Sequence, residues 1–142
     1  MFNIEINNTP ITNNNISSEY VGINIDYATK NNNTIIKNNI INVKRNGIQI
    51  NSDYINMDIL NNKIVANDNG ILVGLGNITN LNLYNNNIHS FNTNYTSHGV
   101  HISTYYTPFA KVNHVFVSKN NISSFSGAAF SFNGYVNSIN YW

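Results

Sequence analysis

Side chains able to carry out chemistry are scarce in this 142-residue sequence. Charged residues make up 9% of it and cysteine is absent, which excludes disulfides and thiolate metal ligands. The acidic residues are Glu5, Glu19, Asp26, Asp53, Asp58 and Asp68. The histidines are His89, His98, His101 and His114. Any catalytic or metal-binding role must therefore rest on very few groups.

Asp68 and His98 are the candidates for catalysis. Each lies just before a glycine, Gly70 or Gly99, that opens an apolar stretch. Hydrolysis of a glycosidic bond generally needs two carboxyl groups that flank the bond, and Asp68 is the only acidic residue in these two stretches. The alternative role of Asp68, a turn residue that caps its own backbone, is the one that the pattern favours.

Aromatic and histidine side chains gather between residues 92 and 111. The candidates for ligand binding are Tyr95, His98, His101, Tyr105 and Tyr106. Aromatic rings with a polar tip can stack on sugar rings, so the cluster indicates a polysaccharide-binding surface. The alternative is that these rings pack their loops against the rest of the protein.

A metal site and a cofactor are not predicted. His98 and His101 are three residues apart, so they are expected on opposite faces of a strand, where they could not share a metal ion. Calcium needs several carboxylate or carbonyl oxygens around it, and the acidic residues are too few and too dispersed in the sequence to supply them.

The elements that position these residues follow from a repeated phrase, Asn-Asn-x-Ile or a close variant. Its closing isoleucines are Ile16, Ile40, Ile64, Ile88 and Ile122. The asparagines two residues before them are Asn14, Asn38, Asn62, Asn86 and Asn120. The aliphatic residues five before them are Ile11, Ile35, Ile59, Leu83 and Val117. A second series, in step with the first, starts at Gly22, Gly47, Gly70, Gly99 and Gly127.

Two series in step predict an all-β fold, a right-handed parallel β-helix solenoid of about five coils with about 24 residues each. One coil buries a handful of aliphatic side chains, worth about 1.5–3 kcal/mol each. Ordering each of its residues costs about 1–2 kcal/mol, so the coils must be stacked to fold. Residues 1–142 are expected to form a single domain, either by themselves or as a segment of a longer solenoid.

The Asn-Asn-x-Ile turns and Gly-Ile-x-Ile strands resemble the coils of the pectate-lyase-like superfamily, a fold also used by phage tailspikes and adhesins. The resemblance covers nearly the whole chain and implies a stacked asparagine ladder at a tight turn. Ser97-His98-Gly99-Val100 resembles the His-Gly motif of polygalacturonase-type glycosidases, which implies a catalytic His98. Asn46 stands where that family has an aspartate, and its Arg-x-Lys substrate clamp is missing, so the implied hydrolase is incomplete.

The fourth repeat is longer than the others, with extra residues at 92–98 and 103–111. Insertions on a solenoid usually mark its binding face. The ligand-binding candidates lie in or beside these two insertions, which strengthens the prediction of a polysaccharide surface there.

Net charge and hydropathy limit the classes of partner that this chain is expected to bind. The net charge is +1, and Lys44-Arg45 is the only adjacent basic pair, so nucleic acid is not expected. No apolar run is long enough for a bilayer, and the N-terminus lacks the apolar core of a signal peptide. An outward apolar stripe of Ile36, Leu60 and Tyr84 is expected to pack in a homotrimer or against a companion domain, unless strand bending makes it a second core column.

These observations favour an extracellular or virion-surface β-helix that binds polysaccharide through the loops of its fourth coil. Two alternatives stay open. One is a polysaccharide lyase or glycoside hydrolase whose site is completed by another chain or segment. The other is a structural stalk or adhesin without a ligand.

Overall fold

The computed structural model describes residues 8, 10–26, 32–91, 96–103 and 111–141, and within these ranges the regular elements are all β-strands. Sheet A comprises β1 (Pro10–Thr12), β4 (Thr34–Lys37), β7 (Tyr54–Leu60), β10 (Ile78–Tyr84), β13 (Lys111–Ser118) and β16 (Tyr135–Tyr141). Sheet B comprises β2 (Asn15–Ser18), β5 (Ile40–Val43), β8 (Lys63–Ala66), β11 (Asn87–His89) and β14 (Asn121–Ser123). Sheet C comprises β3 (Ile23–Asp26), β6 (Ile48–Asn51), β9 (Asn69–Val73), β12 (His98–Ser103) and β15 (Phe130–Asn133). The described residues contain no helix long and apolar enough to span a membrane.

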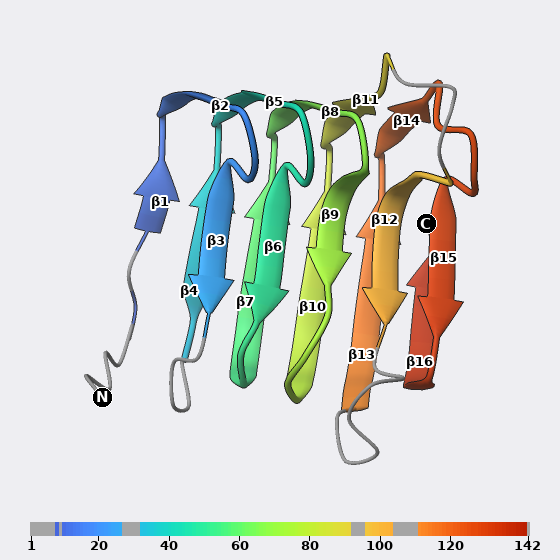
Figure 1. Ribbon diagram of the computed structural model, residues 1–142. Coiled ribbons are helices and arrows are strands. Elements are labelled where there is room, and N and C mark those ends of the chain that lie inside the picture. Colours follow the sequence, from blue (N-terminus) through green and yellow to red (C-terminus); the bar gives the residue numbers. More distant parts are fainter. Residues whose placement is uncertain (1–7, 9, 27–31, 92–95, 104–110, 142) are drawn as a thin grey trace.

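The chain visits sheets A, B and C in turn, and every pairing between neighbouring coils is parallel. In Figure 1 the strands of sheet C run down the near side and those of sheet A run up the far side, while the coils advance from β1 to β16. This winding is right-handed, as parallel crossovers nearly always are. The predicted β-solenoid of about five turns is therefore confirmed.

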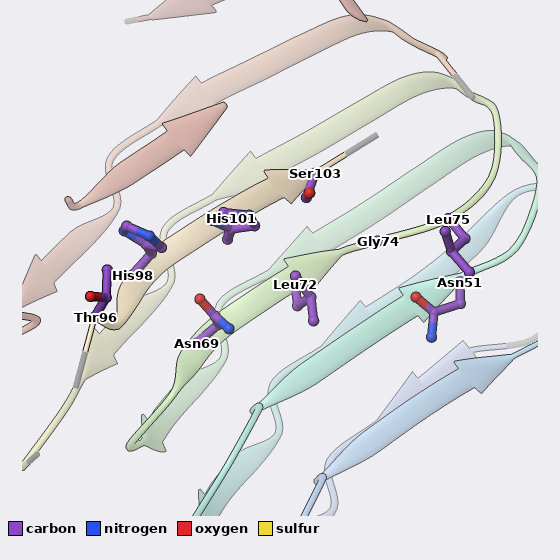
Figure 2. Close-up of a pocket in the computed structure, with 9 residues that line it drawn as sticks. All are labelled: Asn51, Asn69, Leu72, Gly74, Leu75, Thr96, His98, His101 and Ser103. Atoms are coloured by element: carbon purple, nitrogen blue, oxygen red, sulfur yellow. The ribbon is translucent and has the colours of Figure 1, made fainter. Parts of the chain in front are cut away.

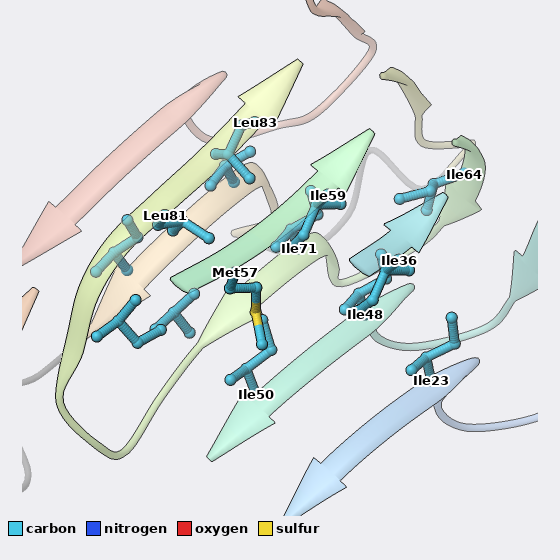
Figure 3. Packing of buried hydrophobic residues seen from close by; sticks show 14 of the residues in the cluster. Ile23, Ile36, Ile48, Ile50, Met57, Ile59, Ile64, Ile71, Leu81 and Leu83 are labelled. Carbon is cyan, nitrogen blue, oxygen red and sulfur yellow. The ribbon is translucent and has the colours of Figure 1, made fainter. Parts of the chain in front are cut away.

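The interior is a continuous apolar core formed by the inward-facing residues of all three sheets (Figure 3). Isoleucine dominates it, and Ile36, Ile48, Ile59 and Ile71 have no exposed surface. Each core column continues from one coil to the next, as in Ile23, Ile48, Ile71 and Val100 of sheet C. β-branched side chains suit this position because they pack well on a pleated surface.

An asparagine ladder turns the chain from sheet A into sheet B. Its members are Asn14, Asn39, Asn62, Asn86 and Asn120, of which the middle three are buried. The backbone N–H and the Nδ2 of every member but the last both donate to the Oδ1 of the asparagine in the next coil, at 2.9–3.0 Å. In the buried members Nδ2 also donates to a backbone carbonyl of the preceding coil, for example from Asn62 to Ile36 at 2.9 Å. Amides this buried are tolerated because they are hydrogen-bonded throughout.

In the second coil the predicted register is wrong by one residue. Asn39, not Asn38, belongs to the ladder, and Ile41, not Ile40, pairs with Ile16. Asn38 instead has φ of 57° and occupies the left-handed turn position directly before the ladder. Asparagine tolerates that conformation. Asn38 and Asn39 are adjacent in the sequence, so the repeated phrase alone does not distinguish the turn residue from the ladder residue.

The same one-residue error in the predicted register makes part of the predicted apolar stripe wrong. Ile36 is buried in the core, and Lys37 takes its place beside Leu60 in the outward column. Leu60 and Tyr84 are only partly exposed, and the Tyr84 hydroxyl accepts a hydrogen bond from Lys119 Nζ at 3.1 Å. The stripe is therefore interrupted by a lysine, and the homotrimer or companion domain stays a prediction.

Four of the five predicted glycines stack at the corner between sheets B and C. A Cβ at Gly70 would lie 2.1 Å from Ile88 Cγ2 and 2.6 Å from the Gly99 carbonyl oxygen, so only glycine fits. In the fifth coil the prediction is wrong, because Ala129 and not Gly127 lies beside Gly99. No described strand of sheet C follows that coil, so a methyl group meets no further neighbour there.

We expect Asn62→Ala to lower the free energy of unfolding by about 3 kcal/mol, because the change leaves several buried polar groups without a hydrogen-bond partner. The Asn62 side chain accepts from both nitrogens of Asn39 and donates to Ile36 and Asn86. The matched control is Asn42→Ala on the exposed face of sheet B, with an expected change within about 0.5 kcal/mol. Urea unfolding measures both, and similar midpoints for the two variants would contradict the ladder's role.

Candidate binding groove on sheet C

An open groove of about 460 Å³ lies on the outer face of sheet C. Its lining comes from three successive coils and consists of Asn51, Asn69, Leu72, Gly74, Leu75, Thr96, His98, His101 and Ser103 (Figure 2). Two of the predicted ligand-binding residues, His98 and His101, are thus brought together in one site. None of the lining residues is acidic, lysine or arginine, so the groove suits an uncharged polar ligand.

The two histidines lie on the same outer face, and the prediction of opposite faces is wrong. The reason is the corner at Gly99, where Gly99 and Val100 both face inward in succession. The alternation of β12 is thereby shifted, and the rings of His98 and His101 stack with centroids 4.8 Å apart and planes 24° apart. The preceding coil makes the same corner, with Asn69 opposite His98 and Leu72 opposite His101.

A hydrogen bond holds the ring of His98, and burial lowers the pKa of His101. Nδ1 of His98 accepts the backbone N–H of Ala128 at 3.0 Å, so in this arrangement its ring proton is on Nε2. Nδ1 of His101 is buried and has no hydrogen-bond partner. Burial, with a further contribution from the charge of His98, lowers the pKa of His101 below its ordinary value of 6.5. His101 is therefore neutral at pH 7.

Amide and leucine side chains complete the groove. The backbone N–H and Nδ2 of Asn69 both donate to Asn46 Oδ1, at 3.2 and 3.0 Å, which holds the Asn69 amide in place. Asn51 lies over Gly74, where a Cβ would come within 2.5 Å of Asn51 Oδ1. Leu72 lies between these two amides and Leu75 lies beside Asn51 (Figure 2), so the groove offers hydrogen bonds beside an apolar surface, as most ligand sites do.

Asp68 lies next to the groove but does not line it. Its carbonyl accepts the backbone N–H of His98 at 3.1 Å, whereas its carboxylate lies 3.6 Å from Arg45 Nε. The backbones of Asp68 and His98 are thus hydrogen-bonded to each other, whereas the Asp68 carboxylate pairs with Arg45 of the preceding coil. Among the described residues no carboxyl group lines the groove, so they do not assemble on this surface the pair of carboxyls that glycoside hydrolysis uses.

Three predicted ligand-binding residues, Tyr95, Tyr105 and Tyr106, lie outside the described residues. Sequence reasoning missed Leu72, Asn69 and the other groove residues of the second and third coils. The register would have found Leu72 and Asn69, because they occupy the positions of His101 and His98 one coil earlier. Among the described residues, no three His, Asp or Glu side chains are grouped so that they could hold a metal ion.

Comparison of the chain with protein-family models, curated proteins and solved structures finds no match. The groove must therefore be interpreted from its own chemistry. That chemistry is a pair of stacked imidazoles and two leucines beside amide and hydroxyl groups.

Acidification is expected to destabilise the fold through His101. Its pKa is lowered in the folded state, so below pH 6.5 the unfolded chain binds a proton more readily and the free energy of unfolding falls. His101→Gln should lose less stability between pH 7.5 and pH 5 than the parent, with His89→Gln on sheet B as the matched control. Denaturant unfolding across this pH range measures the difference. Parallel profiles for the parent and His101→Gln would show that His101 is not responsible.

Proposed function

We propose that this protein is a carbohydrate-binding β-solenoid, related to the pectate-lyase-like superfamily, that binds an uncharged polysaccharide in the sheet C groove. The observation that carries the proposal is the uncharged lining around the His98–His101 stack. Fixed amides can bind hydroxyl groups, while imidazole faces and leucines can pack on the apolar face of a sugar ring.

The geometry of the sheet favours a polymer over a small ligand. Side chains in outward columns repeat from strand to strand at about 4.8 Å, as Asn24, Gln49, Leu72 and His101 do. A linear polysaccharide along the solenoid axis would meet one such side chain after another. Polysaccharides of this kind are found mainly outside the cell, so we place the protein at an extracellular or virion surface.

Support for catalysis is weaker. A glycoside hydrolase would need a second carboxyl group besides Asp68, and a lyase of this superfamily would need several carboxylates around calcium. Neither set is found near the groove in the described residues. An enzyme would therefore have to obtain these groups from another chain or segment. The stalk or adhesin alternative predicts that the groove has no ligand at all.

A glycan array, followed by calorimetry on the polysaccharide that binds, tests the proposal. We expect His101→Ala and Leu72→Ala each to weaken binding about tenfold, since truncating a central contact commonly costs about 1.4 kcal/mol. Tyr105→Ala and Tyr106→Ala test the predicted contribution of the fourth-coil loop. The control His89→Ala, with its ring on sheet B, should bind like the parent.

Equal affinity for His101→Ala, Leu72→Ala and the parent would rule out the groove as the site. Absence of binding to every glycan would favour a structural stalk. Release of reducing ends from a bound polysaccharide, lost in Asp68→Asn, would instead favour the enzyme.

A further inference from the structure

Sheet A lies on a different side of the solenoid from sheet C (Figure 1). Its outer face carries a second arrangement of polar and aromatic side chains. Two rows run across its strands, separated by two residues along each strand. The first row includes Asn33, Asn56 and Asn80, and the second includes Asp58, Asn82 and Phe116. We name these six residues the amide face. They line an open hollow of about 530 Å³.

The first row is fixed by hydrogen bonds between coils. Asn80 Nδ2 donates to Asn56 Oδ1 at 2.6 Å, and Asn56 Nδ2 donates to Asn33 Oδ1 at 2.7 Å. Asn33 in turn donates to Asn8 at 3.1 Å. An amide has two N–H donors and an oxygen with two lone pairs, so these side chains keep hydrogen-bonding capacity toward solvent. Their orientation is set before any ligand arrives.

The second row has no such internal partners. Within the described part of the chain, the side chains of Asp58 and Asn82 take part in no hydrogen bond or ion pair. Phe116 follows Asn82 in the same row and is 38% exposed. An unpaired carboxylate, a free amide and an exposed aromatic ring contribute little to the stability of the fold. Together they form a surface on which a ligand can use all three.

We propose that the amide face is a second carbohydrate-binding surface, specific for an uncharged pyranose oligosaccharide. Asp58 and Asn82 would accept and donate hydrogen bonds to neighbouring hydroxyl groups, and Phe116 would pack against the apolar face of a sugar ring. Strands lie about 4.8 Å apart and the rows roughly 7 Å apart, dimensions comparable with one sugar ring. The carboxylate of Asp58 disfavours an anionic ligand such as a phosphate or a uronate polymer.

This inference does not rest on the function proposed for sheet C, because the two surfaces share no residue. The amide face extends along the same axis as the groove, so one solenoid could engage two polysaccharide strands. Such a protein would cross-link glycans as well as bind them, and the second contact would strengthen attachment by increasing the effective concentration.

NMR titration of the whole chain with soluble β-1,4-linked hexasaccharides of glucose, mannose, xylose and N-acetylglucosamine tests the proposal. We expect at least one of the four to shift the backbone resonances of Asn82 and Phe116. The same shifts should appear in His101→Ala, which separates this surface from the groove. Phe116→Ala and Asn82→Ala should each weaken this binding about tenfold, whereas Asn42→Ala, an exposed asparagine on sheet B, should not.

If none of the four hexasaccharides shifts resonances of the amide face, the proposal is overturned whatever happens in the groove. It is equally overturned if Phe116→Ala and Asn42→Ala bind with the same affinity. Asp58→Asn adds a check on ligand charge, because binding that gains from this change would point to an anionic ligand and contradict the assignment.

Discussion

The hydrogen bond between stacked buried asparagines is the constraint on which the rest of the structure depends. Every ladder Oδ1 after that of Asn14 accepts two N–H groups from the coil before it, so shifting a coil would leave buried polar groups unpaired at a cost of about 1–3 kcal/mol each. The apolar core excludes a one-residue shift, which would turn its isoleucines to solvent, but a two-residue shift would again place apolar residues inward at several positions. The ladder excludes those shifts as well and so completes the definition of the register.

Both proposed binding surfaces follow from that register. Once the coils are locked, outward side chains separated by a whole coil become neighbours, as Leu72 and His101 do on sheet C and Asn82 and Phe116 do on sheet A. Glycine adds the corner that brings His98 onto the same face as His101. Both surfaces consist mainly of strand residues, and the groove adds Gly74 and Leu75 after β9 and Thr96 before β12.

The fold could be predicted because periodicity carries the information that sets it. The parallel solenoid, the number of coils and most ladder members follow from spacing alone. The register errors lie where neighbouring residues are chemically alike. Asn38 and Asn39 fit the same pattern in either order, as do Ile35 and Ile36. Only the left-handed conformation of Asn38 shows which asparagine belongs to the turn and which to the ladder. The stacking of His98 on His101 was missed because simple alternation ignores the glycine corner. Leu72 and Asn69 joined the site through coil-to-coil register, which sequence neighbours do not reveal.

Amide hydrogen exchange in Asn86→Ala tests the ladder most directly. The backbone N–H of Asn62 donates to Asn86 Oδ1 at 3.0 Å, whereas that of Asn39 donates to Asn62 Oδ1, which the substitution leaves in place. The account predicts that Asn62 loses protection at least about tenfold more than Asn39 in the same sample, since about 1.4 kcal/mol of local hydrogen bonding is removed there. Equal loss of protection at both amides would contradict it, because the asparagines would then not be joined coil to coil.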